Sequence, residues 1–177
     1  MAEKRAVKTV SVFGSGRAEP GSAEYETARE LGGALAQAGF AVCTGGYGGV
    51  MEAVSRGAKE AGGHTIGVTA KVFAARANPW VEEEIRVESW HERLLELMRR
   101  GDAYVVLPGG TGTLVELAVV WEWLHKGFLT DKPLVVLGRF WEPVLATVTA
   151  KEDVGHLVTR AATPRQVVEL LQGHFRE

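Results

Sequence analysis

The segment best suited to chemistry is the turn Pro108-Gly109-Gly110-Thr111-Gly112-Thr113, which follows an apolar run at 103–107 and opens a helical pattern. Free backbone N–H groups and the positive end of a helix dipole together bind anions, and they suit a phosphate. Thr111 and Thr113 add hydroxyl donors. The loop has no lysine and no Gly-Lys-Ser/Thr sequence follows it, which excludes a P-loop nucleotide triphosphatase and favours a monophosphate held by the main chain.

Two other glycine-rich turns also follow predicted strands. Gly14-Ser15-Gly16 follows the strand at Val7–Phe13, and Gly45-Gly46-Tyr47-Gly48-Gly49 follows the strand at Phe40–Thr44. The first turn departs from the dinucleotide fingerprint because Glu19 stands in place of the third glycine, so NAD is disfavoured. Each turn allows two interpretations, a backbone close to a ligand or a tight protein turn.

Three further residues have both a chemical and a structural interpretation. Glu116 is either a carboxylate that stabilises a helix N-terminus or a group placed beside the phosphate. Arg93 borders the apolar stripe of a predicted helix and either reaches the site or belongs to a solvated face. Asn78 begins the sequence Asn78-Pro79-Trp80 in the irregular stretch 71–83, and it either lines a pocket or turns the chain.

The elements around these residues alternate between strand and helix, which predicts an α/β fold with a parallel sheet. The apolar strands indicate helices on both faces, in a doubly wound, mostly parallel, Rossmann-like sheet forming a single domain over 1–177. Ligands bind outside the carboxyl ends of such strands. The three glycine-rich turns are therefore expected at one rim. Strands are expected at 7–13, 40–44, 65–69, 85–87, 103–107 and 134–137, and helices at 24–37, 50–61, 90–100, 113–125 and 164–172.

Composition excludes several classes of function. Lys and Arg total 20 against 22 Asp and Glu, which gives a net charge of −2 and no basic face for nucleic acid. No apolar run approaches the roughly 20 residues that cross a bilayer. The first residues form no secretory signal, so a cytoplasmic protein is expected. Cys43 is alone and the five histidines lack metal-ligand spacing, so neither a metal nor a cofactor is expected.

The helix after the third turn is apolar on all sides. Between residues 114 and 124 its charged residues are Glu116 and Glu122. A helix that is apolar all round is buried all round. In a chain of this size a second copy is the simplest cover, so we expect a homodimer through the helix 113–125.

Over about residues 7–145 the sequence resembles the Lonely Guy family, often labelled "possible lysine decarboxylase". The segment from Pro108 to Glu116 resembles the family's PGGxGTxxE signature. Further likeness lies in Val12–Gly16, in Gly45–Met51 and in His91-Glu92-Arg93. A pyridoxal-dependent decarboxylase is disfavoured, because no lysine lies in a motif for a Schiff base.

The resemblance implies a phosphoribohydrolase that cleaves the N-glycosidic bond of a nucleoside 5′-monophosphate, AMP or a cytokinin riboside monophosphate, giving the base and ribose 5-phosphate. It implies Arg93 and Glu116 as the catalytic pair, and it places the 5′-phosphate on Gly109, Gly110, Thr111, Gly112 and Thr113. It places the rest of the nucleotide near Gly14, Ser15, Gly45 and Gly46, with no cofactor required.

The sequence departs from the family pattern at several positions. Leu94, Val115 and Glu122 stand where the family usually has Lys, Glu and Thr. Residues 50–58 and the turn Ala77-Asn78-Pro79 are closer to a sister group that includes molybdenum cofactor carrier proteins. The alternative function is therefore a protein that binds a nucleotide or the molybdenum cofactor without cleaving it.

Overall fold

The computed structural model describes residues 7–176 and contains a seven-stranded sheet in which every neighbouring pair of strands is parallel. The strand order is β4-β3-β2-β1-β5-β6-β7, so the direction of winding reverses between β1 and β5. Such a reversal is where ligands bind in open α/β sheets. The strands are β1 (Thr9–Phe13), β2 (Ala41–Thr44), β3 (Thr65–Ala70), β4 (Glu83–Val87), β5 (Ala103–Val106), β6 (Leu134–Leu137) and β7 (Val158–Ala161).

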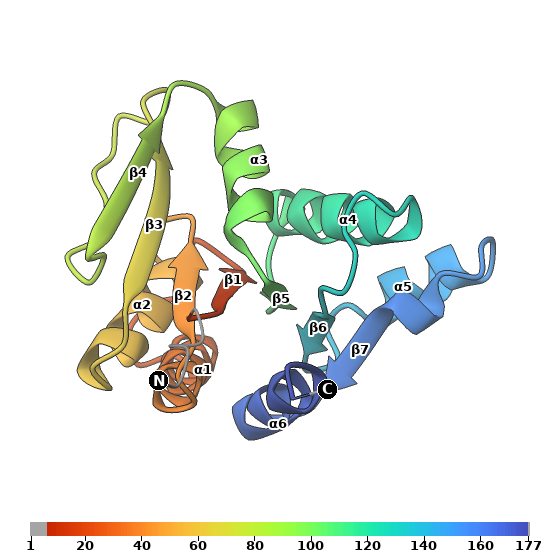
Figure 1. Ribbon diagram of the computed structural model, residues 1–177. Helices are drawn as coiled ribbons and strands as arrows, with labels where there is room; N and C mark the ends of the chain where they lie inside the picture. The colour runs from red at the N-terminus through yellow and green to blue at the C-terminus, as the bar shows by residue number, and fades with distance from the viewer. Residues whose placement is uncertain (1–6, 177) are drawn as a thin grey trace, which may run out of the picture.

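Helices cover both faces of the sheet, which confirms the predicted fold class (Figure 1). On one face α1, α2 and α6 bury Leu31, Val54 and Leu171 against the sheet. On the other face α3, α4 and α5 do the same with apolar side chains that include Leu97 and Leu117. The helices are α1 (Ala23–Gln37), α2 (Val50–Glu60), α3 (Trp90–Arg100), α4 (Thr111–His125), α5 (Glu142–Thr149) and α6 (Pro164–His174).

Side-chain caps fix where three of the helices begin, with Ser22 as the cap of α1. The Ser89 hydroxyl oxygen accepts a hydrogen bond from the backbone amide of Glu92, and the Glu92 carboxylate accepts one from the backbone amide of Ser89, so α3 begins with a capping box. Thr163 caps α6 and Pro164 occupies its first position, as the sequence predicted. The start of α3 matters for function because it sets which residues of that helix face the site.

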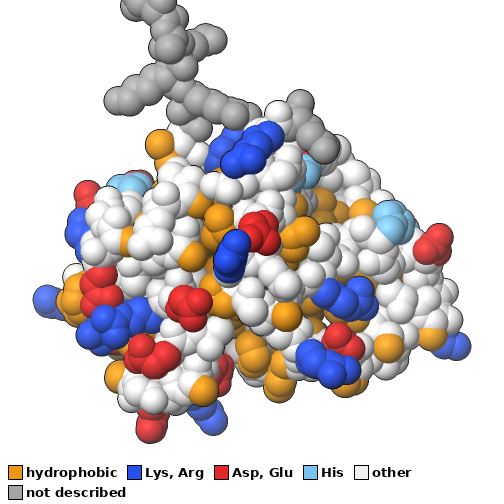
Figure 2. All heavy atoms as spheres, turned by 90° about the horizontal axis from the view of Figure 1, so that it is seen from below, with side chains coloured by type: hydrophobic (Ala, Val, Ile, Leu, Met, Phe, Trp, Pro, Cys, Tyr) orange, Lys and Arg blue, Asp and Glu red, His pale blue; other side chains and the backbone are white. Residues whose placement is uncertain are grey.

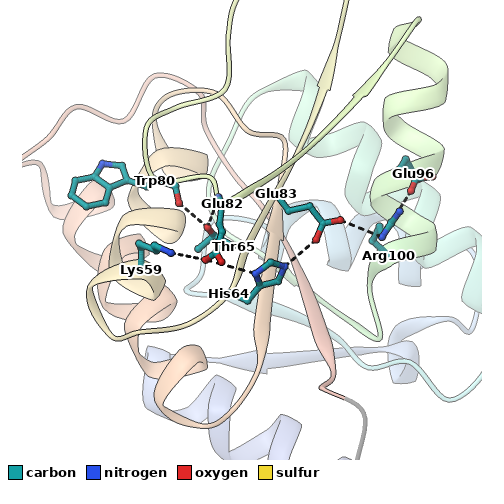
Figure 3. Close-up of polar contacts among 8 residues, drawn as sticks. All are labelled: Lys59, His64, Thr65, Trp80, Glu82, Glu83, Glu96 and Arg100. Atoms are coloured by element: carbon teal, nitrogen blue, oxygen red, sulfur yellow. Dashed lines mark hydrogen bonds and ion pairs between the residues drawn. The ribbon is translucent and has the colours of Figure 1, made fainter.

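Charged side chains hold the edge strand β4 in place (Figure 3). Lys59 of α2 pairs with Glu82 at 2.5 Å, and His64 lies 3.0 Å from Glu83. Arg100 of α3 approaches the same Glu83 at 3.9 Å. Charges along a sheet edge also discourage pairing with another chain. These ion pairs therefore tie β4 and the residue before it to the neighbouring elements. They also place charged groups along this edge of the sheet.

The sequence missed α5, the 3-10 turn Gly155–Leu157 and β7, all within the stretch after β6. It also placed only the last three residues of β4 in a strand. The reason is the same for β4 and β7. Both are short edge strands with exposed polar residues, so neither shows a continuous apolar run.

The described surface mixes charges of both signs. Figure 2 shows lysine and arginine side chains interspersed with aspartate and glutamate on the face seen from below. In that face there is no broad basic area of the kind that duplex nucleic acid requires. Among residues 7–176, no helix is both long and apolar enough to span a membrane.

Candidate active site between the glycine-rich turns

A cavity of about 550 Å³ opens where β1 and β5 end. Its size lies in the range of small-molecule sites, roughly 300–1,000 Å³. The first and third glycine-rich turns meet here, since the amide of Ser15 donates to the carbonyl of Pro108 at 2.9 Å. The cavity is lined by 12–17 of β1 and its turn, by 110–113, and by Gly45, Met51, Arg93 and Glu116.

The third turn presents a row of unpaired backbone donors. Helix α4 begins at Thr111 with Gly110 as its N-cap, and no side chain caps it. Within the described chain, the amides of residues 109–113 donate no hydrogen bond to other protein atoms. Thr113 is 4% exposed and its hydroxyl is also without a partner there. These groups, called the anion cradle below, lie at the positive end of a 15-residue helix, an arrangement that suits an anion.

Glu116 places a carboxylate in the same cavity. It lies in the second turn of α4 and not in the first as expected, because the helix begins two residues earlier than the sequence indicated. Its carboxylate makes no hydrogen bond or ion pair with residues 7–176. Burial raises the pKa of Glu116 to about 7, and the positive charge of Arg93 opposes that rise.

Arg93 turns inward from α3 and is 8% exposed. Its Nε donates to the carbonyl of Val68 at 2.8 Å, and its Nη2 donates to the carbonyl of Gly45 at 2.9 Å. The guanidinium also lies 5.2 Å from the centre of the Tyr47 ring. Burial lowers the pKa of Arg93, and the negative charge of Glu116 works against that effect. The third nitrogen, Nη1, has no protein partner in the described chain, so it is free for a ligand.

The structure brings most of the predicted site residues to this one cavity. Gly14 and Ser15, the loop 110–113, Gly45, Arg93 and Glu116 all line it. Two predicted residues do not line it, Gly46 and Gly109. Gly46 lies behind Gly45 against β3, and Gly109 packs on the side chain of Thr113.

Sequence reasoning missed five of the lining residues, namely Val12, Phe13, Gly16, Arg17 and Met51, and the last two are the ones with long side chains that bear on the site. Met51 lies with its Sδ 3.6 Å from Nη2 of Arg93. The sequence feature that could have identified Met51 is its position just after the second glycine-rich turn, at the start of α2. Arg17 follows the first turn directly. Its positive charge beside a predicted anion site could have identified it as a site residue.

Comparison with known proteins identifies relatives of this chain. The model of the SLOG cluster4 family matches residues 7–168. A cytokinin riboside 5′-monophosphate phosphoribohydrolase from Mycobacterium tuberculosis is 37% identical over 177 residues, covering 95% of this chain and 91% of that protein. The probable phosphoribohydrolase LOGL2 of Oryza sativa is 34% identical over 139 residues, and the alignment covers 72% of this chain but 57% of that longer protein.

A solved structure is also similar over nearly the whole chain. The molybdenum cofactor binding protein of Rippkaea orientalis superimposes with a TM-score of 0.81 and 26% identity, covering 97% of this chain and 99% of that one. Proteins named as hydrolases and proteins named as binding proteins thus share this fold. The family model and the identity to full-length relatives show that the chain belongs to the SLOG cluster4 family, with Lonely Guy phosphoribohydrolases among its relatives.

Proposed function

We propose that the protein is a phosphoribohydrolase that cleaves the N-glycosidic bond of a nucleoside 5′-monophosphate, either AMP or a cytokinin riboside monophosphate. One observation carries the proposal. Glu116 and Arg93 line the same cavity as the amides of the third turn. Among residues 7–176 the Glu116 carboxylate, Nη1 of Arg93 and these amides make no hydrogen bond to protein atoms. The relatives named as phosphoribohydrolases support the same reaction.

The geometry suggests a role for each group. The amides at 110–113 and the hydroxyl of Thr113 hold the 5′-phosphate. The bond from C1′ to the base nitrogen breaks, its electron pair leaves with the base, and the base takes up a proton from solvent, which is matched when Glu116 later releases to solvent the proton that it takes from the attacking water. Glu116 stabilises the positive charge that develops on the ribose. A water molecule then adds its oxygen to C1′ and gives its proton to Glu116, while Arg93 contacts the phosphate or the ribose.

The direct test is incubation of the purified protein with AMP and with isopentenyladenosine monophosphate, following free base and ribose 5-phosphate by chromatography. Equal amounts of base and ribose 5-phosphate are expected. The corresponding nucleosides, which lack the phosphate, serve as matched controls and should react far more slowly. Absence of base release across a panel of purine and pyrimidine monophosphates would contradict the proposal.

The activity should depend on pH through Glu116. The ionised carboxylate is the form that stabilises positive charge, and burial raises its pKa to about 7. We therefore expect kcat/KM to be highest above pH 7 and to fall about tenfold per pH unit well below it. The inhibition constant of ribose 5-phosphate, measured over the same range, separates titration of the phosphate group from titration of Glu116. A flat kcat/KM between pH 5 and 8 would contradict this assignment.

A second candidate function is binding without cleavage, of a nucleotide or of the molybdenum cofactor as cargo. The similarity to the Rippkaea orientalis protein favours it. The described residues contain no group of three or more His, Cys, Asp or Glu suited to a metal ion. A carried cofactor would thus be held through its anionic organic part, by the same amides and Arg93. Calorimetric binding without product formation would support this function over hydrolysis.

We also propose that the protein is a homodimer through α4. The observation in its favour is that the apolar side chain of Leu114, in the first turn of α4, is 37% exposed in the single chain. Covering such a residue with a second copy removes apolar surface from water. The molar mass from light scattering tests this directly, and a monomer at micromolar concentration would contradict it.

A further inference from the structure

Asn78 is a buried polar residue whose hydrogen-bonding groups are all used. It is 9% exposed. Its side-chain Nδ2 donates to the carbonyl of Tyr47 at 2.9 Å and to that of Gly46 at 3.2 Å. Its backbone amide donates to Gly46 as well, at 2.8 Å. Its Oδ1 accepts from the amide of Trp80 at 3.0 Å. A side chain from the irregular stretch 71–82 thus holds the second glycine-rich turn at two successive carbonyls.

The turn that Asn78 holds is the one that holds Arg93. The carbonyl of Gly45 accepts from Nη2 of Arg93 at 2.9 Å, and the Tyr47 ring lies 5.2 Å from the guanidinium. These two contacts come from the residues on either side of Gly46. A change in the path of the backbone at Gly46 would therefore move both contacts to Arg93 together.

The stretch 71–82 adds a direct contact to the same group. Phe73 packs edge-on against Tyr47, with ring centres 5.9 Å apart and an angle of 88° between the planes. The guanidinium of Arg93 also lies 5.9 Å from the Phe73 ring. The stretch therefore contacts Arg93 through Phe73, and Asn78 is its buried residue.

We propose that Asn78 is a positioning residue, which fixes the second glycine-rich turn and through it the orientation of the Arg93 guanidinium in the cavity. This inference rests on the proposed function for its kinetic readout. It assigns a role to a residue that does not line the cavity. Displacing a group that contacts the reacting molecule by about 1 Å costs up to about a hundredfold in rate.

The test is a double-mutant cycle between Asn78 and Arg93, with kcat and KM measured for AMP or the best monophosphate substrate. Asn78→Ala should lower kcat about tenfold or more and change KM less than about threefold, because the anion cradle is not touched. In an Arg93→Ala background the same substitution should change kcat little, since the group it positions is gone. Slow variants are followed in single-turnover reactions.

A second variant keeps the test valid if Asn78→Ala unfolds at the assay temperature. Asn78→Asp has nearly the same shape and still accepts from Trp80, but it puts a carboxylate oxygen opposite the carbonyls of Gly46 and Tyr47. It should lose at least as much kcat as the alanine variant. Arg76→Ala is the matched control, because Arg76 is exposed in the same stretch and has no partner in the described chain.

The outcomes separate this inference from the proposed function. No base release by the unsubstituted protein means that the proposed function has failed. With an active protein, unchanged kcat in both Asn78 variants would overturn the inference. Equal losses of kcat in the background with Arg93 and in the Arg93→Ala background would also overturn it, because Asn78 would then act on stability alone. Loss of kcat restricted to the background that contains Arg93 supports it.

Discussion

Replacing Glu116 with Gln should lower kcat on the order of a hundredfold or more, while KM for the monophosphate changes little. The amide has the shape of the carboxylate but not its charge, so it cannot stabilise a positively charged ribose or accept a proton from water. Under the proposed function the phosphate stays bound, because the amides of the third turn and not Glu116 donate to it. Chromatographic measurement of base release over a range of substrate concentrations gives both constants.

The same substitution should make the protein more stable at high pH. Burial raises the pKa of Glu116 from 4.5 to about 7, so between these values the native state binds more protons than the unfolded state. Stability therefore falls as the pH rises from about 4.5 to 7. Glutamine removes that cost, so at pH 8 the free energy of unfolding should rise on the order of 3 kcal/mol.

Urea unfolding of both proteins at pH 4.5 and pH 8 checks the sign, since the gain should disappear at the lower pH. Lost activity together with lower stability at pH 8 would contradict the role given to Glu116. In that case the carboxylate would be supporting the fold.

Replacing Gly45 with Ala should lower kcat on the order of a hundredfold by displacing Arg93. A Cβ at Gly45 would lie 1.8 Å from Nη2 of Arg93 and 2.6 Å from Sδ of Met51, so the guanidinium has to leave its position. The overpacking should also cost roughly 1–3 kcal/mol of stability. Kinetics and urea unfolding measure the two effects separately.

A matched control for this variant is Gly173→Ala in α6. A Cβ there would meet nothing within 4 Å, and the position is not part of the cavity lining. Activity should be unchanged and stability unchanged or slightly higher, because alanine is the better helix former. A Gly45→Ala protein with full activity would show that hydrolysis does not require Arg93 in the position described.

The alternation of strand and helix, and the meeting of the glycine-rich turns, could be predicted because both follow from local patterns. Apolar runs identify buried parallel strands, and the ends of such strands share one rim. The stretch after β6 could not be read in this way. Helix α5 has eight residues, and β7 exposes Thr159 and Arg160 at its centre, so neither element has a long periodic signal.

The part of the candidate site that could be predicted is the part formed by one continuous segment. The third turn could be identified as a candidate site from its glycines and threonines alone. The inward position of Arg93 depends on carbonyls from β3 and from the second turn, which are 25 and 48 residues away along the chain. The contribution of Asn78 depends on contacts of the same long-range kind, and no local period encodes them.

The anion cradle is built from backbone amides rather than from side chains. Point mutation can exchange an arginine or a lysine, but it leaves an amide in place so long as the backbone keeps its path. Under the proposed function, a lineage that lost Glu116 or reoriented Arg93 would stop cleaving its ligand and would still bind the phosphate. The same proposal implies that a hydrolase and a carrier protein on this fold need differ at only one or two side chains beside a shared backbone site.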